Sequence, residues 1–283
     1  MKKNKYVAEI VGLSFGDGSL TFRKNGSLRY QLRGHVEEKV FYDKHIIPLF
    51  EKNIGKVNIT HYTGKKPYYG ICSENQYLCL GLKSLGIPVG PKKDLKIPAW
   101  IKSDESFLKM FLRGLFDTDG SLFCGKDYNY SEKKHIKLRM SLASTSYNLI
   151  KEVSLSLKRL GIHNLIIKPY KQKKKNWKDL NKIQIDGPNV QDFLNNISLK
   201  NFKHLSKYKI WKHFGFCPPH TSLKQRERIL RSSKYSCSKF PFICFDTARV
   251  AEPGQKIRGE NLLFLTKCAS PMYLERKVEG LVP

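Results

Sequence analysis

The segment GLSFGDGSL at residues 12–20 occurs a second time, in altered form, as GLFDTDGSL at residues 114–122. Each copy ends an apolar run that is typical of a helix. Each also has an Asp-Gly pair at the helix exit, where glycine is the usual residue after the last turn. The final aspartates, Asp17 and Asp119, are separated by the length of a small domain. The sequence therefore predicts a duplicated unit with one such carboxylate per copy.

Gly12 and Gly114 lie inside the two predicted helices. Glycine costs roughly 1 kcal/mol in a helix interior, so both positions need a physical reason. Close approach of two helix backbones is that reason, and it would bring the two aspartates side by side.

The net charge of the chain indicates which kind of molecule it binds. Its 283 residues fit two domains with room for a tail. Lys and Arg number 52 against 24 Asp and Glu, a net charge of +28. Such an excess favours a polyanion, most simply DNA or RNA, and the basic residues recur on predicted strands and loops. Paired carboxylates on so basic a protein indicate metal-assisted cutting of nucleic acid.

Other classes of protein are disfavoured. No segment reaches transmembrane length, so we expect no membrane partner. The apolar run near the N-terminus is interrupted by Glu9 and lacks a cleavage site, which argues against a signal peptide. Seven scattered cysteines suit a reducing compartment.

Hydrophobic periodicity and turn residues predict the same order of elements in both halves. The hairpin signal Asn25-Gly26 lies between two strands, with Leu20 and Phe22 expected to point inward on the first. Ser73 is the expected N-cap of a later helix. Helices are expected at 5–16, 41–53 with a kink at Pro48, 74–86, 105–118, 146–160, 188–197 and 222–231. Further strands are expected at 55–72, 135–144 and 163–186. Each half then reads α-β-β-α-β-β-α.

These elements define the expected architecture. The fold class is α+β, with two pseudo-symmetric units whose antiparallel sheets form a saddle for DNA. We expect the first unit and its linker at residues 1–100 and the second at 101–216. Residues 217–283 are a C-terminal extension to which the sequence assigns no role.

Over residues 5–216 the chain resembles the LAGLIDADG homing endonucleases in their single-chain, two-motif form. The resemblance rests on both motifs, their separation, the repeated order of elements, and the run 97–101 before the second motif. It implies that the motif helices pack at a pseudo-two-fold axis and that Asp17 and Asp119 project into the active site. The first motif departs from the pattern, because Phe15 stands where the second has Asp117. A structural role at the helix end is favoured for Asp117.

The resemblance also implies a metal cofactor. Divalent ions held by carboxylates activate water and stabilise the leaving oxygen in phosphodiester cleavage. Mg²⁺, or Mn²⁺ in its place, suits such hard oxygen ligands. The expected metal-site residues are Asp17, Asp119, Gly16 and Thr118. In the family, two strands are cut across the minor groove, leaving short 3′ overhangs.

Lysines downstream of each aspartate are the remaining catalytic candidates. Lys93 and Lys203 are favoured over Lys92, Lys96 and Lys200, although each alone also fits a phosphate contact. His35 and Glu38, just after the first hairpin, are candidates for organising water, with a plain loop role equally open.

DNA recognition is expected on the outward strand faces. Arg29, Gln31 and Arg33 alternate with apolar residues, and an antiparallel sheet fits the major groove, where each base pair shows a distinct edge. Loop lysines are expected to touch the DNA backbone and position the duplex. The predicted DNA contacts are Arg23, Arg29, Gln31, Arg33, Lys65, Lys66, Lys137, Arg139, Lys173, Lys174 and Lys175.

The function predicted is therefore a site-specific double-strand DNA endonuclease, intron-encoded and monomeric, acting on a long asymmetric target. Two alternatives stay open: an RNA maturase that binds and helps to splice its host intron, and an inactive DNA-binding protein of the same fold. The expected location is the cytoplasm near the nucleoid in a prokaryote, or the matrix or stroma of an organelle.

Overall fold

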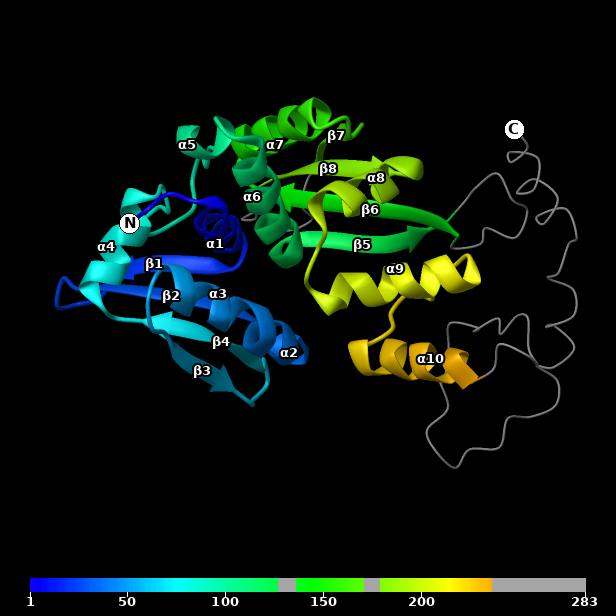
Figure 1. Ribbon diagram of the computed structural model, residues 1–283, viewed down its shortest axis with the longest axis horizontal. Coiled ribbons are helices and arrows are strands. Elements are labelled where there is room, and N and C mark those ends of the chain that lie inside the picture. The colour runs from blue at the N-terminus through cyan, green and yellow to red at the C-terminus, as the bar shows by residue number, and fades with distance from the viewer. Residues whose placement is uncertain (127–135, 171–178, 236–283) are drawn as a thin grey trace, which may run out of the picture.

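The computed structural model describes residues 1–126, 136–170 and 179–235 of the chain. Two units lie next to each other, and helices α1 (Lys5–Gly16) and α6 (Glu105–Thr118) stand at the centre between them (Figure 1). Each of these helices is one of the two motif helices predicted from the sequence, and each leads directly into the first strand of its own unit.

The first unit is built on an antiparallel sheet in the order β1-β2-β4-β3. Its strands are β1 (Gly18–Phe22), β2 (Leu28–His35), β3 (Asn58–Tyr62) and β4 (Tyr68–Ser73). The predicted hairpin joins β1 to β2, and Gly26 supplies the positive φ of +81° that the turn needs. Gly18 pairs with Leu32, so the last residues of β2 lie beside the end of α1.

The second unit repeats this plan in the order β5-β6-β8-β7, again antiparallel. Its strands are β5 (Gly120–Gly125), β6 (Lys137–Ser144), β7 (Leu165–Tyr170) and β8 (Leu180–Asp186). The equivalent strand order confirms the predicted α+β fold of two related units.

Helices cover one face of each sheet. In the first unit these are a 3₁₀ turn η1 (Val36–Glu38), α2 (Lys39–Phe41), a π-helical turn η2 (Tyr42–Ile46), α3 (Ile47–Asn53) and α4 (Gln76–Ser84). After α5 (Ala99–Lys102), the second unit contains α7 (Tyr147–Arg159), α8 (Pro188–Ile197), α9 (Phe202–Phe214) and α10 (Leu223–Tyr235). Helices α9 and α10 lie along one side of the second unit (Figure 1). Within the described ranges no helix is long and apolar enough to cross a membrane.

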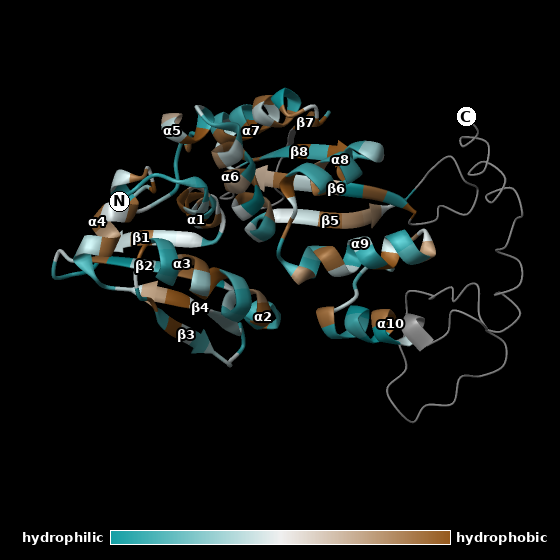
Figure 2. Cartoon of the chain, viewed as in Figure 1, coloured by the Kyte–Doolittle hydropathy of each residue, from teal (hydrophilic) through white to brown (hydrophobic). Residues whose placement is uncertain are grey.

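Strand periodicity separates a core face from an open face. Leu28, Tyr30 and Leu32 on β2 are buried under the helices, whereas the alternating residues are only partly covered. The same alternation runs along β6 in the second unit. Figure 2 shows how hydrophobic and hydrophilic positions mix along the strands and helices. Within the described ranges, no helix covers the open face of either sheet.

Three local predictions differ from the structure. Phe22, expected to point into the core, is 62 % exposed because it ends β1 at the hairpin, beyond the helices. Ser73 is the last residue of β4, and Asn75 caps α4 by accepting the Leu78 N–H at 3.1 Å. The helix predicted at 41–53 contains a π-helical turn before Pro48. Helix α9 was not predicted.

The predicted close packing of the motif helices depends on their glycines. A β-carbon built on Gly114 would lie 2.4 Å from the carbonyl oxygen of Glu9 and 2.7 Å from the amide nitrogen of Leu13. One on Gly16 would lie 2.0 Å from Oγ1 of Thr118. The backbones of α1 and α6 are in contact along their length, so the two helix ends arrive at the same place.

Candidate functional site

The two motif aspartates stand at the ends of the packed helices. Asp17 is the C-cap residue of α1, and Asp119 is the C-cap residue of α6. Their backbone N–H groups donate to the helix carbonyls of Leu13 and Leu115 at 3.1 and 3.0 Å, which fixes both caps. A β-carbon placed on Gly16 would lie 3.4 Å from Cγ of Asp119. The helix crossing thus brings one carboxylate from each unit to a common centre.

The electrostatics of this centre favour a cation. Burial raises the pKa of Asp17 to about 7, and the negative charges of Asp119 and Glu38 add to the rise. Desolvation by the surrounding protein also raises the pKa of Asp119, although that residue is exposed at the surface. Lys92 and Lys203 act in the opposite direction on both carboxyls. Two carboxylates that repel each other are stabilised by a cation bound between them.

A lysine of the linker reaches the centre, and it is Lys92. Its ammonium group donates to the carbonyl oxygen of Phe15 at 2.9 Å and also to that of Gly16, at the last turn of α1. Burial lowers the pKa of Lys92, and the charges of Asp119 and Asp17 counteract that effect. Lys93, the favoured sequence candidate, is exposed. Lys92 and Lys93 are adjacent in a loop that is neither helix nor strand, so no periodic pattern in the sequence shows which of the two points to the centre.

Lys203 approaches from the start of α9. Its Nζ lies 3.4 Å from Oε1 of Glu38, a residue that is buried after β2. Oε2 of Glu38 accepts the backbone N–H of His35 at 2.8 Å, so the carboxylate closes the first turn of η1. The sequence candidates Lys203, His35 and Glu38 therefore belong to one cluster beside the aspartate pair.

The two motifs are not equivalent at the position two residues before the aspartate. Asp117 is fully buried and accepts the backbone N–H groups of Lys200 and Asn201, the latter at 2.8 Å. Burial raises its pKa to about 7. Phe15 at the matching position packs edge-on against Phe111, with ring centres 5.4 Å apart. Asp117 anchors the segment before α9, and Phe15 fills the helix interface.

Two residues at the centre had no sequence signal. Asn201 donates from Nδ2 to Oε1 of Glu38 at 2.7 Å and to the carbonyl oxygen of Asp117 at 2.9 Å, which links the two units. Tyr42, in the π-helical turn, has a buried hydroxyl that makes no hydrogen bond. Burial, followed by the charges of Asp17 and Glu38, raises the pKa of Tyr42. The positions of Asn201 and Tyr42 at the centre depend on tertiary packing, which the hydrophobic periodicity of the sequence does not reveal.

The centre fits a Mg²⁺-type ion that completes its coordination with other oxygens. Among the described residues there is no cluster of three or more His, Cys, Asp or Glu side chains that would hold an ion alone. Mg²⁺ commonly uses one or two carboxylates together with water and substrate phosphates, which matches Asp17 and Asp119. The hydroxyl of Thr118 donates to the carbonyl of Gly114 at 2.9 Å, so this side chain serves its own helix.

A polar cavity of about 300 Å³ adjoins the centre. Glu38 and Lys203 form part of its wall, and Arg226 of α10 forms another part. Arg226 is buried and donates from Nε to the Ser206 hydroxyl at 2.9 Å, which attaches α10 to α9. The first helix of the C-terminal extension therefore packs beside the candidate site.

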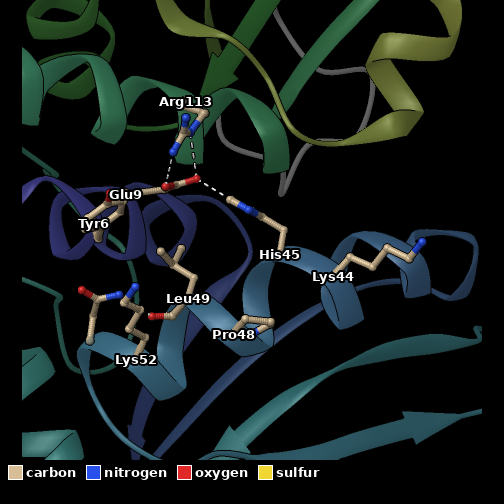
Figure 3. A pocket seen from close by; sticks show the side chains of 9 residues that line it. Tyr6, Glu9, Lys44, His45, Pro48, Leu49, Lys52 and Arg113 are labelled. Atoms are coloured by element: carbon tan, nitrogen blue, oxygen red, sulfur yellow. Dashed lines mark hydrogen bonds and ion pairs between the residues drawn. The ribbon is translucent and has the colours of Figure 1, made fainter.

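Glu9, nearer the start of α1, is completely buried between the units (Figure 3). It accepts from Nε of Arg113 at 2.9 Å and lies 2.6 Å from Nε2 of His45. Burial opposes the charge of Glu9, but the hydrogen bonds of His45 and Arg113 outweigh it and lower the pKa of Glu9. This cluster joins α1, α6 and the π-helical turn η2.

The predicted base-reading residues of the first sheet lie on its open face. Gln31 Nε2 and Arg33 Nε make no hydrogen bond within the protein. The Arg33 guanidinium stacks 4.5 Å above the ring of Tyr68. Arg29 Nε lies 3.5 Å from Glu74, which also pairs with Arg23. Nε2 of Gln31 and Nε of Arg33 are thus shielded from solvent and have no hydrogen-bond partner within the protein.

The remaining predicted contacts fall into three groups. Lys65 and Lys66 are exposed in the loop between β3 and β4. On the second sheet Lys137 is exposed, whereas Arg139 Nε pairs with Asp186 at 3.3 Å. Residues 173–175, the predicted basic loop of the second unit, lie outside the described residues.

Comparison with known sequences gives the family of the second unit. Residues 106–204, from the start of α6 to the start of α9, match the sequence model of the LAGLIDADG-like domain. These residues form a LAGLIDADG-like domain. The match contains Asp119 and Asp117, and ends just after Lys203. The LAGLIDADG resemblance expected from the two motifs is thereby supported.

Similar proteins that match more of the chain than the second unit share little sequence identity with it. An uncharacterized protein of Methanocaldococcus jannaschii is 25 % identical over 169 residues, which is 57 % of each chain. This chain therefore spans little more than half the length of that curated relative. Similar solved structures include mesophilic variants of the homing endonuclease I-DmoI, at 16 % identity and a TM-score of 0.46 over 68 % of this chain and 94 % of that one.

Two further LAGLIDADG structures are similar at the same level. I-DmoI in complex with DNA and Mn is 18 % identical, with a TM-score of 0.43 over 68 % of this chain and 96 % of that one. Full-length WhiA from Thermatoga maritima is 16 % identical, with a TM-score of 0.45 over 82 % of this chain and 66 % of that one.

Proposed function

We propose that this protein is a metal-dependent, site-specific DNA endonuclease that cuts both strands of its target. The observation that carries the proposal is the meeting of Asp17 and Asp119 at the crossing of α1 and α6, with Lys92 and Lys203 beside them. An inactive binding protein has no need for two mutually repelling carboxylates, which destabilise the folded chain unless a cation neutralises them.

The proposed chemistry divides between the cofactor and the chain. Bound Mg²⁺ or Mn²⁺ would supply an activated water and would neutralise charge on the leaving oxygen. Asp17 and Asp119 would hold the ion as carboxylates, so ion binding would displace the proton that the raised pKa of Asp17 favours. The ammonium groups of Lys92 and Lys203 would stabilise negative charge that develops on the phosphate. Glu38 and Asn201 position Lys203 and the segment before α9.

Several features support double-stranded DNA as the substrate. A net charge of +28 favours a polyanion, and the open sheet faces follow directly from the two aspartates through Gly18 and Gly120. The face with Arg29, Gln31 and Arg33 carries the donors that read guanine and adenine in the major groove. Because one chain supplies two units that differ in sequence, a monomer would fit a long asymmetric site. Intron homing is the proposed biological role.

A pool of random duplexes makes the test independent of the target sequence. The full chain is incubated with this pool in Ca²⁺, and the bound sequences are enriched. The enriched sequences are then cloned into a plasmid. Cleavage is then followed in Mg²⁺, beside gel-shift binding in Ca²⁺. We expect double-strand cleavage with short 3′ overhangs, and we expect Asp17→Asn and Asp119→Asn each to abolish cleavage while sparing binding.

The alternatives give different results in the same assay. Sequence-specific binding without cleavage in either Mg²⁺ or Mn²⁺ would indicate the inactive DNA-binding protein. Selective binding of intron RNA over duplex DNA would indicate the maturase. Full cleavage by Asp17→Asn would show that the aspartate pair does not form the catalytic centre.

A further inference from the structure

The open face of the second sheet differs in chemistry from that of the first. Leu165 and Ile167 on β7 point to this face, because they pair with Gln184 and Lys182 of β8, which also lie on it. Leu165 is 68 % exposed and Ile167 is 39 % exposed. Among the described strands of the first sheet, the open face shows no equivalent aliphatic pair: its third and fourth strands place Asn58, Thr60, Tyr62, Tyr68, Gly70 and Cys72 there.

The polar groups on this second face are largely used within the protein. Arg139 pairs with Asp186 at 3.3 Å, and Gln184 donates to the same carboxylate at 2.9 Å. The ammonium of Lys182 lies 5.5 Å from the centre of the Phe123 ring, which opposes Arg139 on β5. As on the first sheet, where Arg29 and Arg33 make comparable contacts, the arginine Nε atom is left without a hydrogen bond. The difference between the two faces is therefore the exposed aliphatic pair Leu165 and Ile167.

DNA offers one apolar group in its major groove, the 5-methyl group of thymine. A duplex fits this face better than an apolar protein partner does, because Lys182 pairs directly with Ile167 and the exposed Lys137 lies on the same face of the sheet. The face is also continuous with the aspartate centre, since β5 begins at the residue after Asp119. Aliphatic side chains at this location can distinguish thymine from cytosine without a hydrogen bond.

We propose that Leu165 and Ile167 are specificity-determining residues that read thymine methyl groups, so that the second unit selects a thymine-containing half-site. The first unit selects its half-site through hydrogen bonds to guanine and adenine. The protein thus uses two modes of readout on one duplex. This inference rests on the proposed binding of double-stranded DNA, and it adds the base composition of one half of the target.

The experiment compares thymine with uracil, which lacks only the methyl group. Duplexes enriched by the full chain in Ca²⁺ are resynthesised with uracil in place of thymine, in one half-site at a time, and affinities are measured. Each methyl group buried against an aliphatic side chain contributes about fourfold in affinity. We expect that loss in one half-site only.

Variants connect the effect to the two residues. The double variant Leu165→Ala, Ile167→Ala should bind thymine and uracil duplexes equally well. Leu155→Ala is the matched control, because Leu155 is similarly exposed on α7 of the same unit but lies on the helical side. This control should keep the full difference between thymine and uracil.

The outcomes separate this inference from the proposed function. If no duplex is enriched, the proposed DNA-binding function itself is wrong. If duplexes are enriched but uracil has no effect in either half, the methyl-reading inference alone is overturned. It is overturned as well if the double variant still distinguishes thymine from uracil.

Discussion

Gly12 and Phe111 meet where α1 crosses α6: a β-carbon on Gly12 would lie 2.1 Å from the carbonyl oxygen of Phe111. That oxygen belongs to a helix backbone, so it cannot move without displacing the helix. Only glycine, whose side chain is a single hydrogen atom, fits at position 12 with the helices this close together. A larger residue there would push the helices apart and with them the two aspartates at the helix ends.

Gly12→Ala should destabilise the protein even though alanine is the better helix former by roughly 1 kcal/mol. Overpacking of this kind costs about 1–3 kcal/mol, and occasionally more. Chemical denaturation measures the change, and Ala99→Leu, which adds bulk at an exposed position of α5, serves as the control. Gly114→Leu should be worse than Gly12→Ala. An unchanged midpoint for Gly12→Ala would contradict the close helix contact.

Neighbouring lysines give a test of the candidate centre. Lys92→Met should slow cleavage by roughly 100-fold, because an ammonium aimed at developing charge is lost from a partly buried position. Lys93→Met removes the same charge from an exposed position one residue away, and cleavage should remain at the wild-type rate. Single-turnover rates on the enriched plasmid substrate measure both. Equal rate losses would mean that the linker acts only through its total charge.

The buried Glu9 should make stability depend on pH. Its pKa in the folded protein lies below the ordinary value of 4.5, so the folded state binds fewer protons than the unfolded state at low pH. Its contribution is complete above about pH 5 and is lost as the pH falls through the folded-state pKa. Stability should therefore decline on acidification, as followed by urea denaturation at a series of pH values.

Glu9→Gln isolates this contribution. At pH 7 the variant should be less stable by about 3–5 kcal/mol, because Arg113 loses its buried counterion. Its decline at low pH should be shallower than that of the wild type. Glu105→Gln breaks an exposed pair with Lys109 and should change neither quantity appreciably. If stability fell equally steeply with decreasing pH in Glu9→Gln and the wild type, the ion pair between Glu9 and Arg113 would be refuted.

Arg33 and Lys66 separate base reading from phosphate binding. Arg33→Ala should cost about 1–3 kcal/mol at one base pair of the target and relax specificity there. Lys66→Ala should weaken binding to all DNA sequences equally. It should also reduce the slope of log affinity against log salt concentration by about one unit. Binding is measured on the enriched duplex and its single-base variants over a range of salt. Uniform weakening by Arg33→Ala would assign that side chain to the phosphate backbone.

Much of the fold was predictable because its signals are local or periodic. The repeated motif, the glycines of the helix crossing and the alternation along β2 each depend on a few adjacent residues. Helix α9 was missed because its apolar residues do not gather on one face. Phe22 was misplaced because strand alternation does not show where the covering helices end.

The candidate centre was only partly predictable for a different reason. Asp17 and Asp119 belong to the repeat, whereas Lys92 comes from a proline- and glycine-rich loop whose path is set by tertiary contacts. Asn201 and Tyr42 reach the centre from elements that are unrelated in sequence to the motifs. The spacing of residues along the chain does not reveal such contacts between distant segments.

The link from Asn201 to Glu38 and Asp117 has a consequence for synthesis on the ribosome. Both aspartates and both sheets are translated before Asn201 and Lys203, so a nascent chain presents its carboxylates without the group that holds Glu38. Premature termination before this point would leave the same incomplete arrangement. Under the proposed function, the ability to hold DNA would develop during translation, and a finished cutting centre would exist only in chains extended past residue 203.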